Sequence, residues 1–212
     1  MSAFPHFSGA FMFSSILISL IIAIQNAPAA NPQDAAMPSL KKAGASDSQL
    51  MELFGAKLDK MDGTTVNTKE ALKDRKQIVL YFSASWCGPC RRFTPDLVSY
   101  AKANKDTKDF IVILVGSDQT AAKQADYMKK YDMDFYAIPF DKARLGKIKR
   151  LYGGGGIPNL VILQPDGKVV KGSYESNGKY SPKDRKSYIG PKPVLETLKN
   201  MVSGDGKKPS NP

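Results

Sequence analysis

The sequence predicts an α/β domain in which a central mixed β-sheet is flanked by α-helices. Two continuous apolar runs, "QIVLYFSA" and "FIVILVGSD", are each followed by a segment with helical patterning. Further along, "IPNLVILQPDGKVVKGSY" contains two strand-like stretches joined by a Pro-Asp-Gly turn. Alternating strands and helices, followed by a hairpin and a last helix, indicate a mixed sheet with helices on both faces.

The first half of the domain supplies two helices and a buried strand. "SDSQLMELFGAKL" begins with a Ser-Asp capping pair and has apolar residues at helical spacing. "MDGTTVN" carries a turn signal and predicts a hairpin or a short strand. "QIVLYFSA" is apolar throughout, as in a strand that is buried on both faces. "CRRFTPDLVSYAKAN" predicts a helix that Pro95 kinks, because proline lacks an amide hydrogen and crowds the preceding turn.

The second half repeats this pattern and then closes the domain. "FIVILVGSD" predicts a second buried strand, and Ser117 or Asp118 is expected to cap the helix "QTAAKQADYMKKY". The Pro-Asp-Gly turn predicts an antiparallel hairpin. "PKPVLETLKNMV" predicts the last helix, with proline near its start.

The N-terminus predicts export. Residues 1–30 contain no Asp, Glu, Lys or Arg, and the apolar run from Ala10 to Ile24 has the length of a signal-peptide core. Ala27 and Ala29 form a small-x-small pair, which favours cleavage after Ala29. No Lys or Arg precedes the run, so the alternative is an uncleaved membrane anchor at residues 7–24. Either alternative predicts a periplasmic or extracellular protein.

Composition divides the chain into four parts. Residues 1–29 are the predicted signal peptide or anchor, and residues 30–46 are small, contain proline and lack periodicity, which is typical of a linker. Residues 47–202 form the predicted domain. Residues 203–212, "SGDGKKPSNP", have almost no apolar side chains and predict a disordered tail.

The chain is basic, with a net charge of +11 from 31 Lys and Arg against 20 Asp and Glu. Such a charge is compatible with an anionic partner. However, the longest Lys/Arg runs are pairs, which favours a generally basic, solvated surface, and we expect no nucleic-acid partner.

Both cysteines of the chain, Cys87 and Cys90, lie in "YFSASWCGPCRRFTP". A four-ligand metal site needs two more soft or nitrogen ligands. The only histidine is His6, in the predicted signal, so we expect no metal. A structural disulfide here would close almost no loop and would stabilise the fold little. A redox pair explains the spacing best, and no cofactor is expected.

The predicted position of Cys87 at the start of a helix favours its thiolate. Unpaired amide hydrogens and the helix dipole attract an anion there, and Arg91 and Arg92 follow in the next turn. Cys90, one turn into the helix, is then placed to attack a mixed disulfide. The alternative for the arginine pair is a solvated helix face.

Three neighbours of the cysteines have predicted supporting roles. Gly88 and Pro89 shape the tight start of the helix, where a proline costs little because its amide would be unpaired. Trp86 offers a flat apolar surface beside the attacking sulfur.

A second unusual segment, "YGGGGIPNLVIL", lies far along the chain. One interpretation is a flexible loop before a strand. The other is that Ile157-Pro158 is a cis peptide opposite the thiols, with the Ile157 amide and carbonyl free to bind an extended substrate segment.

These motifs together resemble the thioredoxin superfamily. "WCGPC" at a strand-helix junction, Pro95 in the next helix and "GIP" before a hairpin are its recurring parts, and "YFSASWCGPCRRFTPDL" is particularly similar to the tryparedoxin and nucleoredoxin branch. The resemblance covers residues 66–200 and implies a thioredoxin-like fold. It also implies an attacking Cys87, a resolving Cys90, a redox-active Cys87–Cys90 disulfide and a cis-proline at Pro158.

Two positions depart from the family pattern. Thioredoxins have a buried Asp six residues before the first cysteine, where this chain has Tyr81, whose unperturbed pKa of about 10 makes it a poor base. The tryparedoxin-like branch shares that Tyr but usually has Pro-Pro between its cysteines, whereas this chain has Gly-Pro.

The sequence therefore predicts a thiol–disulfide oxidoreductase that reduces protein disulfides outside the cytoplasm. Its expected partners are a protein or small-molecule disulfide and an unidentified electron donor. It would meet a membrane only through an uncleaved N-terminal segment. The alternative is a thioredoxin-like module that binds proteins without turnover, through Trp86 and Ile157-Pro158.

Overall fold

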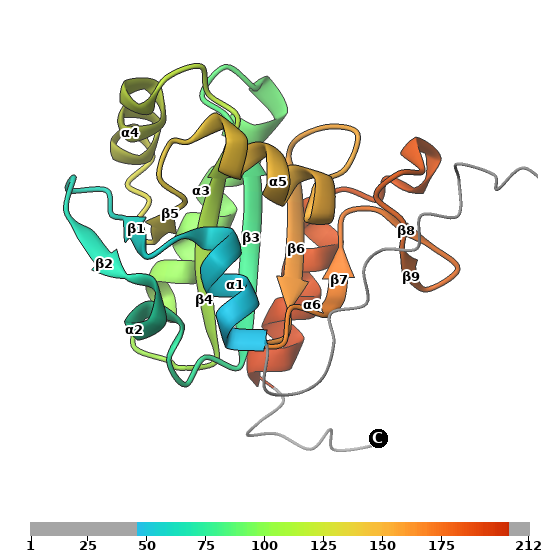
Figure 1. Ribbon diagram of the computed structural model, residues 1–212. Coiled ribbons are helices and arrows are strands. Elements are labelled where there is room, and N and C mark those ends of the chain that lie inside the picture. The colour runs from blue at the N-terminus through green and yellow to red at the C-terminus, as the bar shows by residue number, and fades with distance from the viewer. Residues whose placement is uncertain (1–45, 204–212) are drawn as a thin grey trace, which may run out of the picture. The chain divides into compact units, whose positions relative to one another are not determined.

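The computed structural model describes residues 46–203, in which a seven-stranded sheet lies between two layers of helices (Figure 1). The elements in chain order are α1 Ser46–Phe54, β1 Lys57–Asp59, β2 Thr65–Asn67, α2 Thr68–Leu72, β3 Gln77–Ser83, α3 Gly88–Ala103, β4 Phe110–Gly116, α4 Ala121–Lys130, β5 Tyr136–Ala137, α5 Lys142–Tyr152, β6 Asn159–Leu163, β7 Val169–Gly172, β8 Glu175–Ser176, β9 Lys179–Tyr180, the 3₁₀ turn η1 Arg185–Ser187, and α6 Pro191–Ser203.

The sheet is mixed, as the sequence predicts. Its strand order is β2-β1-β5-β4-β3-β6-β7. The two long apolar strands, β3 and β4, lie side by side and parallel, from the pair Gln77↔Phe110 to the pair Ser83↔Gly116. β6 runs antiparallel to β3, and β7 runs antiparallel to β6. β8 and β9 form a separate small hairpin.

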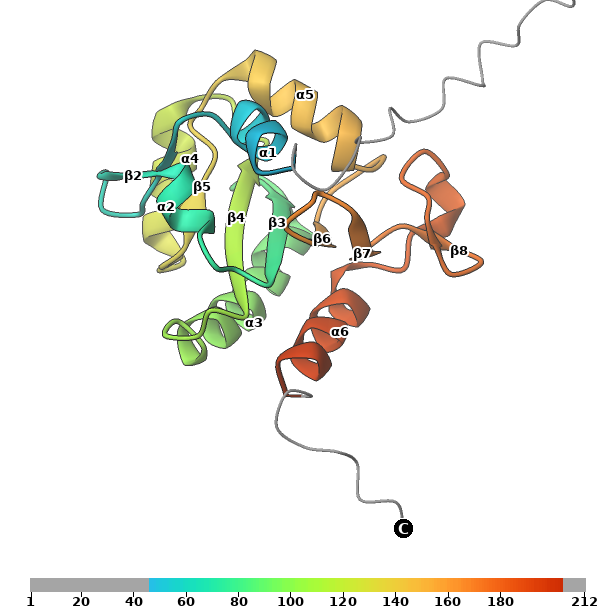
Figure 2. The same cartoon turned by 60° about the horizontal axis from the view of Figure 1, so that its bottom comes forward.

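Alternate residues of the three central strands face opposite layers of helices, because side chains alternate across a strand. In β3, Val79 and Tyr81 belong to one buried cluster, with side chains of α3, α4 and α6. Ile78, Leu80 and Phe82 belong to the other, with side chains of α1, α2 and α5. Figure 2 shows α1 and α5 on one face of the sheet and α3 and α6 on the other.

The first predicted helix is shorter than expected. It ends at Phe54, and Gly55 follows with φ of 89°, a left-handed conformation that glycine adopts readily and that commonly ends helices. Leu58, which the pattern assigned to that helix, is buried in β1. β1 pairs with β2 as the antiparallel hairpin that "MDGTTVN" predicts.

Two details in the second half differ from expectation. The predicted cap at Ser117 or Asp118 is wrong, because Thr120 caps α4 by accepting a hydrogen bond from the Lys123 amide at 3.2 Å. α5 was not predicted, although Asp141 caps it and buried Leu145, Ile148 and Tyr152 have helical spacing.

Several predicted segments lie outside the described residues. These are the signal peptide or anchor at residues 1–29, the linker except Ser46, and residues 204–212 of the tail; Ser203 itself ends α6. Within residues 46–203, no helix combines the length and apolar character that a membrane span requires.

Leu114 lies in the middle of β4 and is fully buried. Leu114→Ala should lower the free energy of unfolding by about 2–5 kcal/mol, because it removes apolar contacts and leaves a cavity. Val170→Ala is the matched control: Val170 is 39% exposed in β7, so its truncation should cost less than about 1 kcal/mol. Urea denaturation measures both values, and equal losses would contradict this assignment of the core.

Candidate functional site

The two cysteines lie where β3 leads into α3, as the sequence predicts. Cys87 is the residue that caps α3, and its sulfur accepts a hydrogen bond from the Cys90 amide at 3.1 Å. Pro89 lies in the first turn of the helix, where no amide hydrogen is needed. Cys87 and Cys90 form a disulfide with a Cα–Cα distance of 5.2 Å. Cys87 is 5% exposed and Cys90 is fully buried, so only Cys87 has any surface open to an incoming group.

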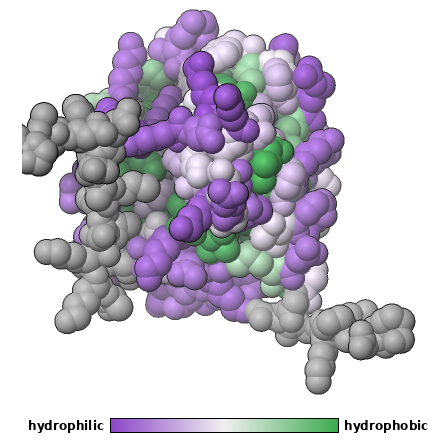
Figure 3. Space-filling model, turned by 90° about the vertical axis from the view of Figure 1, so that its right-hand side faces the viewer, coloured by the Kyte–Doolittle hydropathy of each residue, from purple (hydrophilic) through white to green (hydrophobic). Residues whose placement is uncertain are grey.

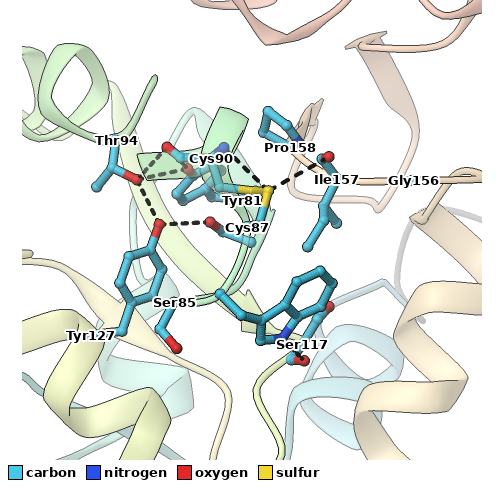
Figure 4. The surroundings of a disulfide bond; sticks show 12 residues. Tyr81, Ser85, Cys87, Cys90, Thr94, Ser117, Tyr127, Gly156, Ile157 and Pro158 are labelled. Carbon is cyan, nitrogen blue, oxygen red and sulfur yellow. Dashed lines mark hydrogen bonds between the residues drawn. A yellow bond between two sulfur atoms is a disulfide. The ribbon is translucent and has the colours of Figure 1, made fainter. Parts of the chain in front are cut away.

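The pairing of β3 with β6 brings the Ile157-Pro158 segment to the disulfide. Phe82 near the end of β3 pairs with Asn159 at the start of β6. The Ile157-Pro158 peptide, just before Asn159, is cis, and the Ile157 carbonyl oxygen lies 3.8 Å from the Cys87 sulfur (Figure 4). Two segments 70 residues apart in the chain thus meet at one sulfur atom.

The loop that holds Trp86 is tied to the loop after β4. The Trp86 indole is 58% exposed and donates to the Ser117 carbonyl at 3.1 Å. Asp118, which was expected to cap a helix, instead accepts hydrogen bonds from the Ser85 amide at 3.0 Å and the Ser85 hydroxyl at 2.6 Å. These bonds fix the orientation of the exposed indole beside the disulfide.

A chain of four buried hydroxyl groups lies beneath the disulfide (Figure 4). The Tyr81 and Thr94 hydroxyls are 2.9 Å apart, Thr94 and Tyr127 are 2.7 Å apart, and Tyr127 and Ser83 are 2.9 Å apart. Thr94 also donates to the Cys90 carbonyl at 2.8 Å. The network therefore connects the core of the domain to the backbone of Cys90.

Burial raises the pKa of Tyr81 far above its usual value, and the neighbouring Tyr127 raises it further. Tyr81 thus stays protonated at neutral pH and cannot act as a base there. Its hydroxyl lies 3.3 Å from the Cys90 carbonyl, which it reaches as a donor. The sequence predicted a supporting role for Tyr81 but missed Ser83, Thr94 and Tyr127. Only Thr94 carried a local signal, because it follows Cys90 by one helical turn.

Two tyrosines that the sequence analysis missed hold the Ile157-Pro158 segment from its other side. The Tyr188 hydroxyl donates to the Pro158 carbonyl at 2.7 Å, and the Tyr174 hydroxyl donates to the Gly156 carbonyl at 3.4 Å. Their rings lie against each other, with centroids 5.0 Å apart. The carbonyls on either side of Ile157 are thereby bound to tyrosines, while the Ile157 carbonyl faces the sulfur.

The run of four glycines has a steric explanation. A Cβ atom at Gly154 would lie 1.9 Å from the Tyr174 ring, and a Cβ atom at Gly155 would lie 3.0 Å from the Arg185 side chain. Glycine at these positions lets both side chains pack directly on the backbone that leads to Ile157. The run is therefore a packing surface for the segment between β7 and α6.

The remaining predicted residues lie at the mouth of the site. Gly88 is the first residue of α3, and Arg91 and Arg92 follow on its exposed side. Neither arginine forms an ion pair with another described residue. Across residues 46–203, no group of three or more His, Cys, Asp or Glu side chains is arranged to hold a metal ion.

Comparisons with known proteins agree with this geometry. A family model described as thioredoxin-like matches residues 74–169. Tryparedoxin of Trypanosoma brucei brucei is 35% identical over 99 residues, which cover 46% of this chain and 67% of that protein. The crystal structure of a thioredoxin from Wuchereria bancrofti is 33% identical, covers 69% of this chain and 96% of its own, and has a TM-score of 0.53.

This chain belongs to the thioredoxin superfamily. Within it, the tryparedoxin and nucleoredoxin branch is the one that the sequence suggested. Nucleoredoxin of Xenopus laevis is 43% identical over 93 residues, or 43% of this chain. The fold expectation is confirmed as well, and this thioredoxin-like protein is a member of an oxidoreductase family. The matches span only 18–27% of the length of nucleoredoxins from Arabidopsis thaliana, Xenopus laevis and mouse.

The comparisons overturn one expectation. The apolar N-terminus predicted a periplasmic or extracellular protein, with residues 7–24 as an anchor if uncleaved. The nucleoredoxin relatives of mouse, human, Xenopus and Arabidopsis are nuclear and cytoplasmic proteins, which contradicts that location. Export was predicted from only two properties of the apolar run, its length and its lack of charge. The run itself lies outside the described residues.

The hydroxyl network can be tested through Tyr127. Tyr127→Phe leaves the buried Ser83 and Thr94 hydroxyls each without one partner, and it should lower the free energy of unfolding by about 1–3 kcal/mol. Tyr131→Phe is the control, because its half-buried ring packs on Tyr127 but its hydroxyl has no hydrogen-bond partner among the described residues. Urea titration compares the two variants. A loss at Tyr127 no larger than that at Tyr131 would argue against the network.

The tyrosine contacts to the Ile157-Pro158 segment predict a local effect. Tyr188→Phe removes the hydrogen bond to the Pro158 carbonyl but keeps the ring, so this segment should open more often. Amide hydrogen exchange of residues 154–160 should become faster by about fivefold, as expected for a net loss of about 1 kcal/mol. The β4 amides serve as the internal reference. A uniform change across both segments would show global destabilisation instead.

Proposed function

We propose that this thioredoxin-like protein is a thiol–disulfide oxidoreductase that reduces protein disulfides through Cys87 and Cys90. The observation that carries the proposal is the position of the Cys87 sulfur. It caps α3, accepts the Cys90 amide at 3.1 Å and is the less buried of the two sulfurs. A helix N-terminus with an amide directed at the sulfur favours the thiolate, which is the attacking species.

The reaction begins with the reduced protein. The Cys87 thiolate attacks one sulfur of the substrate disulfide, which forms a mixed disulfide and releases the other substrate sulfur as a thiolate. Cys90, after losing its proton, attacks the Cys87 sulfur and releases the second substrate thiol. Two electrons have then moved from the cysteine pair to the substrate, and a Cys87–Cys90 disulfide remains.

Substrate binding uses the groups that surround the sulfur. Trp86 provides an exposed apolar surface, and the Ile157 backbone provides a hydrogen-bonding edge for an extended segment. The tyrosine contacts to Gly156 and Pro158 hold that edge in place.

Cys90 must lose its proton without the help of a carboxylate, because this chain has Tyr81 at the position where thioredoxins have a buried Asp. Because burial raises the Tyr81 pKa, its hydroxyl keeps its proton near neutrality and cannot accept the proton of Cys90 as a base. Its hydrogen bonds, and that of Thr94, hold the first turns of α3 in place. The Cys90 proton must therefore pass to water that enters the site during the reaction or to another group.

The reduced state must be restored by an electron donor, which we propose to be a dithiol-bearing protein or small thiol. One structural relative, a tryparedoxin II, has a solved structure in complex with glutathionylspermidine. That molecule shows that a small partner binds a protein of this branch, and a small-molecule disulfide remains the second class of substrate for this chain.

Insulin reduction with dithiothreitol as electron source tests the function. The wild-type protein should accelerate reduction, and Cys87→Ser should lower the rate by about a hundredfold or more, because the nucleophile is lost. After dithiothreitol has been removed, pre-reduced Cys90→Ser mixed with insulin alone should instead accumulate a mixed disulfide at Cys87, seen as a mass increase that added dithiothreitol reverses. A correctly folded wild-type protein that is inert in this assay, yet binds partners, would favour the non-catalytic binding module.

A further inference from the structure

The exposed apolar side chains of this protein gather around the disulfide. Only four large apolar residues are exposed among residues 46–203, and three of them, Trp86, Tyr188 and Ile189, lie near the redox centre. Exposed apolar side chains that cluster in this way mark interaction surfaces. Figure 3 shows the face that carries β7 and the β8–β9 hairpin, where hydrophilic side chains cover most of the surface and leave small apolar patches between them.

Tyr188 and Ile189 form one wall of a groove of about 380 Å³. Its floor is apolar and includes Pro89, which lies between the two cysteines, and Pro158. The groove is therefore continuous with the redox centre. It lies on the side of α3 and α6, and Trp86 is not among the residues that line it.

The groove also has a positive rim. Arg92 from α3 and Lys192 from α6 line it, and no Asp or Glu is among the described residues that do so. Both side chains are exposed, and neither forms an ion pair with another described residue. Asp96 and Glu196 lie one helical turn further along the same helices and line a neighbouring pocket, which Lys192 also borders without forming an ion pair with either. Two cations without partners beside an apolar floor are complementary to an acidic side chain next to an apolar one.

We infer that this groove binds the polypeptide segment next to the disulfide of a protein substrate, and that it selects a segment with an apolar and an acidic side chain. The inference rests on the proposed function and names the substrate class of the same site. The apolar side chain lies against Tyr188 and Ile189, and the carboxylate pairs with Arg92 and Lys192. The sulfur chemistry is the two-step exchange described above, and dithiothreitol supplies the electrons in the test.

The probes are peptides with one intramolecular disulfide, a leucine beside one cysteine, and either Glu or Lys at a single position. The position is varied over three residues on each side of that cysteine. For at least one position, the wild-type protein should reduce the Glu peptide with a kcat/KM about two- to fivefold higher than the Lys peptide, the upper part of the range of an exposed ion pair. Raising the salt concentration to about 0.5 M should diminish this ratio, because the charges are solvent-accessible.

Arg92→Glu/Lys192→Glu should invert the preference, so that the Lys peptide becomes the better substrate. Lys57→Glu/Lys69→Glu is the control with the same change in net charge, placed on exposed residues of β1 and α2, across the sheet from β6. It should keep the wild-type ratio. Ile189→Ser should raise the KM of the leucine peptide more than that of a glycine peptide, because only the former loses an apolar contact.

The outcomes separate the two proposals. If the wild-type protein reduces no peptide at all, the proposed function fails. If it reduces every Glu and Lys peptide at equal rates, or if the control shifts the ratio as much as the groove variant, the function stands and the groove proposal is overturned. A preference that survives charge reversal at Arg92 and Lys192 would likewise place the selecting residues elsewhere.

Discussion

The antiparallel register between β3 and β6 is the constraint on which the whole site depends. The pair Phe82↔Asn159 fixes the Cys87 loop, which follows β3, against the Ile157-Pro158 segment, which precedes β6. A slip of one residue would exchange the two faces of β6, so that Leu160 and Ile162 would leave one buried cluster and Val161 would leave the other. The packing of both helix layers therefore favours the observed register. The parallel pairing of β3 with β4 similarly brings the loop containing Asp118 to Ser85. The position of one sulfur thus follows from the burial of two sheet faces.

Neutral hydroxyl groups, rather than buried charges, organise the space under the disulfide. Tyr81, Thr94, Tyr127 and Ser83 satisfy one another's hydrogen bonds, so burying them costs little. A carboxylate at Tyr81 would need a compensating charge or would be held protonated. The site therefore supports the sulfur chemistry through position and backbone amides, and it contributes no buried base at this position.

The features of the fold that depend on residues close together in the chain could be predicted from the sequence. Continuous apolar runs identified β3, β4 and β6, and the pattern around Cys-Gly-Pro-Cys correctly placed the two cysteines at a strand-helix junction. Helix α5 was not predicted, because Gly146 and several basic residues interrupt its apolar spacing. The contacts of Tyr174 and Tyr188 join side chains to carbonyls 18 and 30 residues away, and no local pattern encodes such a distance. The run of four glycines was recognised as unusual, but the steric reason for it depends on distant side chains such as Tyr174.

The two proposals assign the disulfide exchange and the selection of substrate to different parts of the chain. β3 and α3 hold the two sulfurs, whose exchange reaction requires only their position and protonation. The segment from Ser173 to Pro191 contacts no sulfur directly, yet it supplies Tyr174 and Tyr188 and the exposed Ile189. This segment contacts Pro158, beside the backbone edge that a substrate segment would join. It also lines the groove in which the side chains of that substrate would lie. Under the proposed function, changes here would alter which disulfide is chosen while leaving in place the Cys90 amide that binds the Cys87 sulfur. Partner choice would then diverge while the cysteine pair stays constant.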